Sequence, residues 1–214
     1  MLEFEGTKHE EGEAMKLMLL AVALLLTPMV DQTLSPAERD HAVAELGSSR
    51  KAFLEATSGL SETQWNFKPA PDHWSIAECA EHIGVTEGFI LNLITEQALK
   101  GPAEPEKRAL VQGKDSSIMV TGADRSTKFK APESIQPTRR WATSGEITKN
   151  VLENRVRTIA FVNTTQEDLR DHFMDHPVYK TLDTYQWILL LSAHMRRHTA
   201  QILEVKAEAN FPKQ

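Results

Sequence analysis

From residue 31 onward, apolar residues recur at helical spacing in four long segments that are separated by polar or proline-containing stretches. The last segment runs from about Thr181 to Ala209, and one of its faces is apolar except for two histidines. That face contains, at intervals of three or four residues, Trp187, Leu191, His194, His198, Ile202 and Val205. No segment shows the strict alternation of a half-buried strand, so the pattern predicts an all-α protein.

Local signals mark where three of these helices begin. Ser35, Ser75 and Thr143 each precede a glutamate by three residues, which is the capping box of a helix N-terminus. Pro36 follows the first of them, at the helical position where proline is best tolerated. We therefore expect helices to begin directly after Ser35, Ser75 and Thr143.

Residues 100–142, between the second and third long helices, are interrupted by several glycines and prolines. A connection of this length inside a compact domain usually crosses over the fold or has a function. Within it, only the stretch from Glu106 to Val120 predicts a short helix. A further short helix is expected from Thr165, ending before Pro177. Four long helices with one long connection predict a four-helix bundle with a crossover.

His194 and His198 occupy positions of the last helix where leucine would normally face the core. Side chains four residues apart lie on one side of a helix, and each buried imidazole needs a hydrogen-bond partner. This pair alone leaves two readings open, core histidines with such partners or ligands of a shared metal ion. His82 lies in the apolar stripe of the second helix and favours the metal. Three imidazoles leave a coordination position open, as in catalytic zinc sites.

Other candidate side chains are interpreted as structural or solvent-exposed. His172 and His176 are also four residues apart, but the following proline disfavours a helix there, so we expect them at the surface. Glu78 is explained by its place in the capping box, and Glu81 is expected to face solvent. Cys79, the one cysteine, lies on a helix face that is predicted to be buried.

Composition narrows the classes of function. The formal net charge is −6, and no run of lysine and arginine is interleaved with aromatic residues, so binding of nucleic acid is not expected. With one cysteine in the chain, an intrachain disulfide is excluded.

Residues 1–30 differ from the rest and are treated as a leader that precedes a domain at residues 31–214. Lys16 is followed by an apolar run from Leu17 to Leu26, which is too short to span a bilayer but typical of a signal peptide. The alternative is a short hydrophobic helix packed on the domain. We therefore expect an exported, periplasmic protein without a stable membrane span, and a cytoplasmic protein if the alternative holds.

Two stretches together carry a resemblance to a known family. "PDHWSIAECAEHIG" (residues 71–84) and "HMRRHTAQI" (residues 194–202) resemble the DinB-like superfamily of bacterial metal-binding helix bundles, over roughly residues 35–206. The resemblance implies an up-down-down-up bundle in which His82, His194 and His198 hold a divalent metal ion, with zinc or nickel expected. It also implies that homodimers are common. Characterised members include transferases for small thiols such as bacillithiol and mycothiol, and hydrolase chemistry has been proposed for others.

Two functional hypotheses follow. In the first, the protein is a metal-dependent enzyme, a thiol transferase or a hydrolase, acting on a small molecule that the sequence does not identify. The 100–142 connection would then cover the site, with Arg125 and Lys128 as candidate anion contacts. In the second, it is a non-catalytic, stress-associated metal-binding bundle. Export would favour hydrolysis or binding, because thiol cofactors act in the cytosol.

Overall fold

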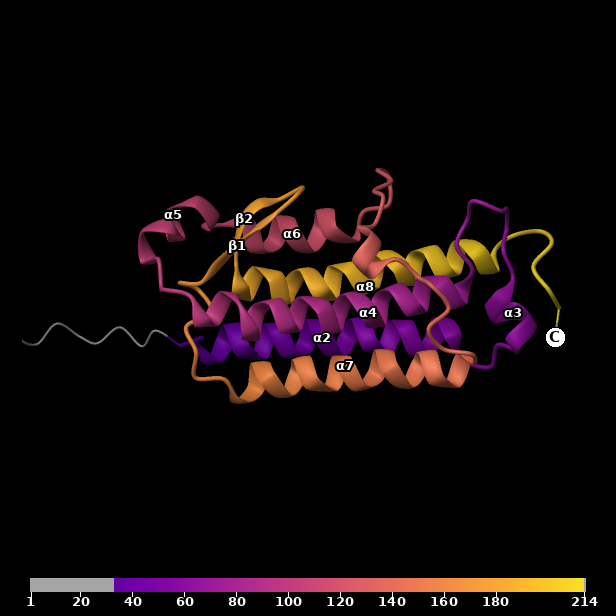
Figure 1. Ribbon diagram of the computed structural model, residues 1–214, viewed down its shortest axis with the longest axis horizontal. Helices are drawn as coiled ribbons and strands as arrows, with labels where there is room; N and C mark the ends of the chain where they lie inside the picture. The colour runs from indigo at the N-terminus through magenta and orange to yellow at the C-terminus, as the bar shows by residue number, and fades with distance from the viewer. Residues whose placement is uncertain (1–32, 214) are drawn as a thin grey trace, which may run out of the picture. The chain divides into compact units, whose positions relative to one another are not determined.

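The computed structural model describes residues 33–213, and these residues are mostly helical (Figure 1). The predicted leader, and with it the domain boundary at residue 31, lies outside the described residues. The elements are, in chain order, α2 (Pro36–Thr57), α3 (Glu62–Asn66), α4 (Ile76–Glu96), η1 (Ala98–Lys100), η2 (Pro105–Lys107), α5 (Arg108–Val111), α6 (Lys114–Ala123), η3 (Glu133–Ile135), α7 (Ser144–Thr164), β1 (Phe173–His176), β2 (Lys180–Asp183) and α8 (Thr184–Lys206). None of the helices in this part of the chain has the length and apolar character needed to cross a membrane.

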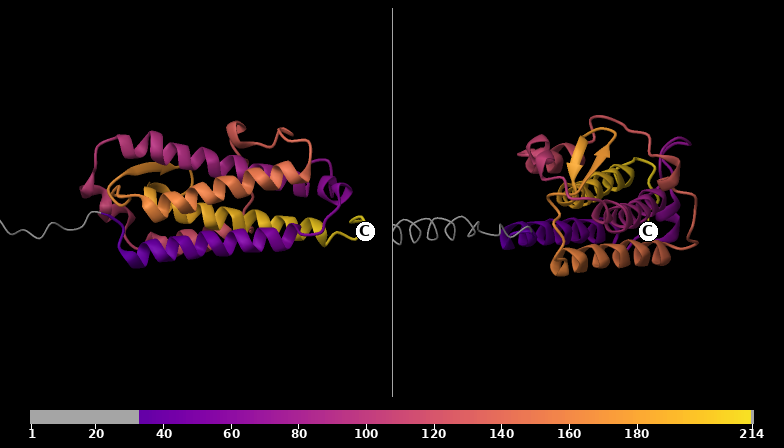
Figure 2. Two further views of the ribbon diagram at one scale, coloured as in Figure 1. Left: turned by 90° about the horizontal axis from the view of Figure 1, so that it is seen from below. Right: turned by 60° about the vertical axis from the view of Figure 1, so that its left-hand side comes forward.

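The long helices α2, α4, α7 and α8 form a four-helix bundle with up-down-down-up topology (Figures 1 and 2). Around the bundle, α2 packs on α8, α8 on α4, α4 on α7 and α7 on α2. α4 and α7 run in the same direction, since Gly84 approaches Asn150 and Gly88 approaches Asn154. The predicted fold class is confirmed, including the long connection between the second and third long helices.

Every one of the three predicted capping boxes is present. The Ser35, Ser75 and Thr143 side chains accept a hydrogen bond from the backbone N–H three residues later, and the glutamate there accepts one in return. The structure adds two boxes that the sequence reading missed, at Ser61 before α3 and at Asp183 before α8. Helix N-termini leave N–H groups without an intrahelical partner, and these local bonds satisfy them.

The region after α7 departs from the prediction. The short helix expected from Thr165 to before Pro177 is absent, and residues 173–183 form an antiparallel hairpin, β1–β2, where no strands were predicted. Leu182 of β2 is fully buried, and the Met174 carbonyl accepts a hydrogen bond from the Trp187 indole. Packing on α8 therefore decides the conformation of this segment. The sequence did not reveal it, because hydrophobic periodicity over so few residues is a weak signal.

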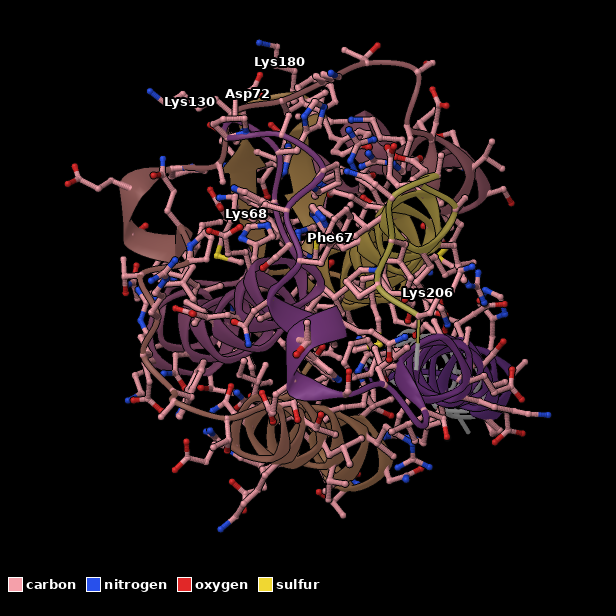
Figure 3. All side chains as sticks on the ribbon, turned by 90° about the vertical axis from the view of Figure 1, so that its right-hand side faces the viewer. Phe67, Lys68, Asp72, Lys130, Lys180 and Lys206 are labelled. Atoms are coloured by element: carbon pink, nitrogen blue, oxygen red, sulfur yellow. The ribbon has the colours of Figure 1, made fainter. Side chains whose placement is uncertain are left out.

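The core consists of two groups of buried apolar side chains along the bundle. One contains Leu46, Ile90 and Leu189, and the other contains Phe53, Ile83 and Ile202. The connection between α3 and α4, with Phe67, Lys68 and Asp72, lies over the same end of the bundle as Lys206 near the end of α8 (Figure 3). Because Trp74 and the α4 N-terminus follow that connection, this is the end of the bundle that carries the three histidines.

Candidate metal site

The three histidines predicted as metal ligands lie together. His82 comes from the second turn of α4, and His194 and His198 come from successive turns of α8, which packs on α4. One ring nitrogen from each lies within 4.8 Å of the others, and the ring centroids of the three pairs are 4.5 to 4.9 Å apart. Two neighbouring helices thus bring three imidazoles to one point.

Hydrogen bonds determine which ring nitrogens face that point. His82 Nδ1 lies 2.7 Å from the carbonyl oxygen of Ile135, so Nδ1 carries the hydrogen and the lone pair lies on Nε2, which faces His194. His198 Nδ1 lies 2.9 Å from the Gln201 side-chain oxygen, with the same consequence. Partners of this kind fix the orientation of histidines that bind metals.

Burial keeps the three imidazoles neutral. Burial is the largest cause of the lowered pKa of His82, His194 and His198. Burial, with a smaller contribution from nearby His82, lowers the pKa of His198 to about 3. The neutral ring is the form that offers a lone pair to a metal ion. At neutral pH the cluster therefore needs no deprotonation before it can bind a cation.

The distance between His82 and His194 fits a shared metal ion. The Nε2 atoms of His82 and His194 are 3.0 Å apart. Two nitrogens bound to one ion at about 2.0–2.1 Å, with an angle of about 90–110° between them, lie about 2.9–3.4 Å apart. Within the described part of the chain the cluster contains imidazoles alone, with no carboxylate or thiolate. Such a donor set suits borderline transition metals and not Mg²⁺ or Ca²⁺, which prefer oxygen.

Trp74 forms a wall of the site. Its ring lies 4.9 Å from the His82 ring and is stacked at 5.8 Å on His198, measured between centroids. His82 and His198 are buried, whereas His194 is partly exposed. The cluster is thus enclosed on the side of Trp74 and retains some access to solvent at His194.

Two acidic residues close to His82 have different roles. Glu78 caps α4, as predicted, and forms an ion pair with Lys68 at 3.0 Å. The prediction that Glu81 faces solvent is wrong, since it is only 2 % exposed. Its carboxylate binds the backbone of residues 138–140 in the connection between α6 and α7. Helical periodicity could not reveal this, because the partner is a loop that folds back over the helix.

The residues predicted as anion contacts have other surroundings. Both oxygens of the Glu204 carboxylate accept hydrogen bonds from Arg125, at 2.7 Å each, and Arg125 also binds the Gln201 side chain. Lys128 is exposed. The charge of Arg125 is therefore balanced by Glu204 at the surface of α8.

Within residues 33–213, the remaining histidines and the cysteine lie outside the cluster. His176 ends strand β1 and His172 directly precedes it, so neither lies in a helix, but the expectation that both lie at the surface is wrong. His172 is buried with its Nδ1 3.0 Å from the Ala98 carbonyl, and His176 packs on Trp187. Cys79 is fully buried, as predicted, and burial raises the pKa of its thiol, so it is not a nucleophile.

Sequence reasoning missed the groups that orient the ligands. Gln201 could have been found, because it lies three residues after His198 on the same helix face. The Ile135 carbonyl could not, since any residue type offers one and only the course of the loop places it against His82.

Comparison with known proteins identifies relatives of this chain. A family model described as the DinB superfamily matches residues 45–202. The uncharacterised protein YuaE of Bacillus subtilis (strain 168) is 26 % identical over 148 residues, which cover 69 % of this chain and 86 % of that protein.

A solved structure shares the fold. YfiT from Bacillus subtilis, described as a probable metal-dependent hydrolase with an unusual four-helix bundle topology, superposes with a TM-score of 0.53 at 14 % sequence identity. The match covers 81 % of this chain and 89 % of that one. At this identity the similarity shows a common fold.

Proposed function

We propose that this chain, which belongs to the DinB superfamily, binds one divalent transition-metal ion at His82, His194 and His198 and acts as a metal-dependent hydrolase on a small molecule. The observation that carries this proposal is the composition of the cluster. Three imidazoles converge, and no fourth protein ligand joins them within residues 33–213. An ion with three protein ligands keeps a position for water or substrate, as catalytic metal sites do.

The chain's own residues hold and shield the site. The Ile135 carbonyl and the Gln201 side chain keep the hydrogens of His82 and His198 on Nδ1, so that both Nε2 atoms remain available. Trp74 excludes water from one side of the cluster. When bound, the ion supplies Lewis acidity, which polarises a carbonyl or phosphoryl oxygen and lowers the pKa of water. Zinc and nickel both suit imidazole ligands.

Hydrolysis is favoured over the transfer of a small thiol. YfiT, which shares the fold, is described as a probable metal-dependent hydrolase. The set of three histidines also favours a catalytic site over a purely structural one, which would be closed by four protein ligands. Thiol transfer and a non-catalytic role are distinguished from hydrolysis by the activity assays described below.

Elemental analysis of the purified full chain tests the metal site. We expect one zinc or nickel ion per chain, with most of it lost in His194→Ala and in His198→Ala. His176→Ala is the matched control, because His176 lies in the hairpin and should leave the metal content unchanged. Stoichiometric metal in a His82→Ala/His194→Ala double variant would exclude this site.

Activity is then measured on the metal-free and reloaded protein with ester, amide and thiol-transfer substrates. We expect metal-dependent cleavage in one of the first two classes. Turnover in the thiol-transfer assay alone would identify a transferase instead. Stoichiometric metal with no turnover in any class would favour the non-catalytic bundle.

A further inference from the structure

Residues 124–140, here called the strap, connect the end of α6 to the approach to α7 and cross from α8 over α4 (Figure 1). At its first end, Arg125 binds Glu204 and Gln201 of α8. Further along, the Thr127 carbonyl accepts a hydrogen bond from Arg197, whose guanidinium lies 5.4 Å from the centre of the Phe129 ring. The strap is thus fixed to α8 by residues that surround His198 in sequence.

At its second end, the strap is fixed to α4 by one carboxylate. Glu81 accepts hydrogen bonds from the backbone N–H groups of Thr138 at 2.8 Å, Arg139 at 3.0 Å and Arg140 at 3.3 Å. The Arg140 guanidinium adds an ion pair at 2.9 Å. Arg139 has a positive φ of 62°, a conformation that is unfavourable for a residue with a side chain. The bonds to Glu81 therefore help to offset the cost of this backbone conformation.

The strap reaches a ligand of the proposed metal ion between these two ends. The Ile135 carbonyl, three residues before Thr138, accepts the hydrogen bond from His82 Nδ1 at 2.7 Å. His82 directly follows Glu81, so one turn of α4 holds both the carboxylate that fixes the strap and the imidazole that the strap orients. The other partner of His82 Nδ1 is Thr86 Oγ1 at 3.4 Å, so the Ile135 carbonyl makes the shorter of the two bonds that hold the ring and its tautomer.

We propose that Glu81 is a positioning residue for the three-histidine cluster, acting through the backbone of residues 138–140 and the Ile135 carbonyl on His82. The role rests on the metal site proposed above. It predicts that metal affinity depends on a carboxylate that contacts no ligand. Loss of a group that orients a metal ligand without binding the metal itself typically weakens metal affinity by about 10–100-fold.

The test compares Glu81→Gln with Glu78→Gln by competition for Zn²⁺ against a chelator of known affinity. Glu78 is the matched control, because it lies on the same helix and binds Ser75 and Lys68 but not the strap. We expect Glu81→Gln to weaken zinc binding by about 10–100-fold. Glu78→Gln should lower the melting temperature and leave the zinc affinity unchanged. Equal affinities of Glu81→Gln and the unmodified protein would overturn the proposal.

A second measurement separates this inference from the metal site itself. In the metal-free protein, the His82 Nδ1–H hydrogen bond should give a slowly exchanging imidazole proton signal in the NMR spectrum. We expect this signal to disappear in Glu81→Gln and to remain in Glu78→Gln. If the unmodified protein binds no zinc, the metal site is wrong, and this signal still decides the role of Glu81. If Glu81→Gln does not fold, Arg140→Met is the alternative variant, because it removes the ion pair between the strap and Glu81. An unchanged imidazole signal and an unchanged zinc affinity in Arg140→Met would contradict the proposal.

Discussion

At the scale of single residues, Arg155 of α7 is a charged side chain in the core of the bundle, and it requires polar partners there. It is fully buried and contacts the other three long helices, donating to Glu87 of α4 at 2.6 Å, to Ser49 of α2 at 2.7 Å and to the Leu191 carbonyl of α8 at 3.3 Å. Glu87 is 2 % exposed. Charges are costly to bury, so each member of this pair depends on the other.

We expect Arg155→Met to lower the free energy of unfolding by about 3–5 kcal/mol, because it leaves the Glu87 carboxylate buried without its counter-charge. The double variant Arg155→Met/Glu87→Leu should recover much of this loss, since both charges are then absent. Urea denaturation of the single and double variants gives both values. A single variant within about 1 kcal/mol of the unmodified protein would show that water or protonation compensates Glu87.

At the scale of elements, the packing of α6 on α8 depends on a glycine. A Cβ atom at Gly122 would lie 2.9 Å from the Ala193 Cβ and 3.1 Å from a Leu190 methyl group. Ala193 directly precedes His194 in α8. Gly47 of α2 is different, because a Cβ there would meet no atom within 4 Å.

The two glycines predict opposite effects of one substitution. Gly47→Ala should raise the free energy of unfolding by about 0.5–1 kcal/mol, because alanine loses less backbone entropy in a helix. Gly122→Ala should lower it by about 1–3 kcal/mol, because the extra methyl group has no space. Thermal and urea unfolding of the two variants measure the difference. Equal stabilisation by both would show that α6 can move away from α8 without cost.

At the scale of the whole molecule, the bound metal and the apolar core stabilise the fold separately. The two groups of buried apolar side chains extend along the bundle, beyond the reach of the three histidines. An ion that binds only the folded state stabilises it by about 2.7 kcal/mol when its free concentration is 100 times its dissociation constant.

We therefore expect chelation to lower the melting temperature by about 5–10 °C and to leave the helix content largely intact. Far-UV circular dichroism before and after chelation, combined with a thermal scan, measures both effects. Loss of the helical spectrum at 25 °C on chelation would instead show that the metal ion is required for folding.

The export prediction also belongs to the whole molecule, because the compartment limits the available substrates. Residues 15–30 carry the expected signal segment and lie outside the described residues. We propose that the mature chain begins near residues 27–33 in the periplasm. N-terminal sequencing of the protein from fractionated native cells measures this. An intact Met1 or Met15 end from the cytosol would contradict export and make thiol transfer the leading reaction.

The sequence by itself determined the four long helices and which histidines lie on their core faces, because both depend on interactions between near neighbours. A capping box joins residues three apart, so Ser35, Ser75 and Thr143 marked helix starts correctly. Helical periodicity placed His194 and His198 on the core face, and apolar neighbours placed His82 there too. Their convergence required one further assumption, that the two helices pack together in the bundle.

Only the tertiary structure decided what surrounds those ligands. Glu81 and Thr138 are 57 positions apart, and His82 and Ile135 are 53 apart, so no local pattern relates them. The same holds for the Arg155–Glu87 pair and for the hairpin that replaces a predicted helix. The physical reason is that a backbone carbonyl or N–H is present at every non-proline residue. Which of them meets a given side chain depends on the course of the loop, and packing on α8 and α4 sets that course.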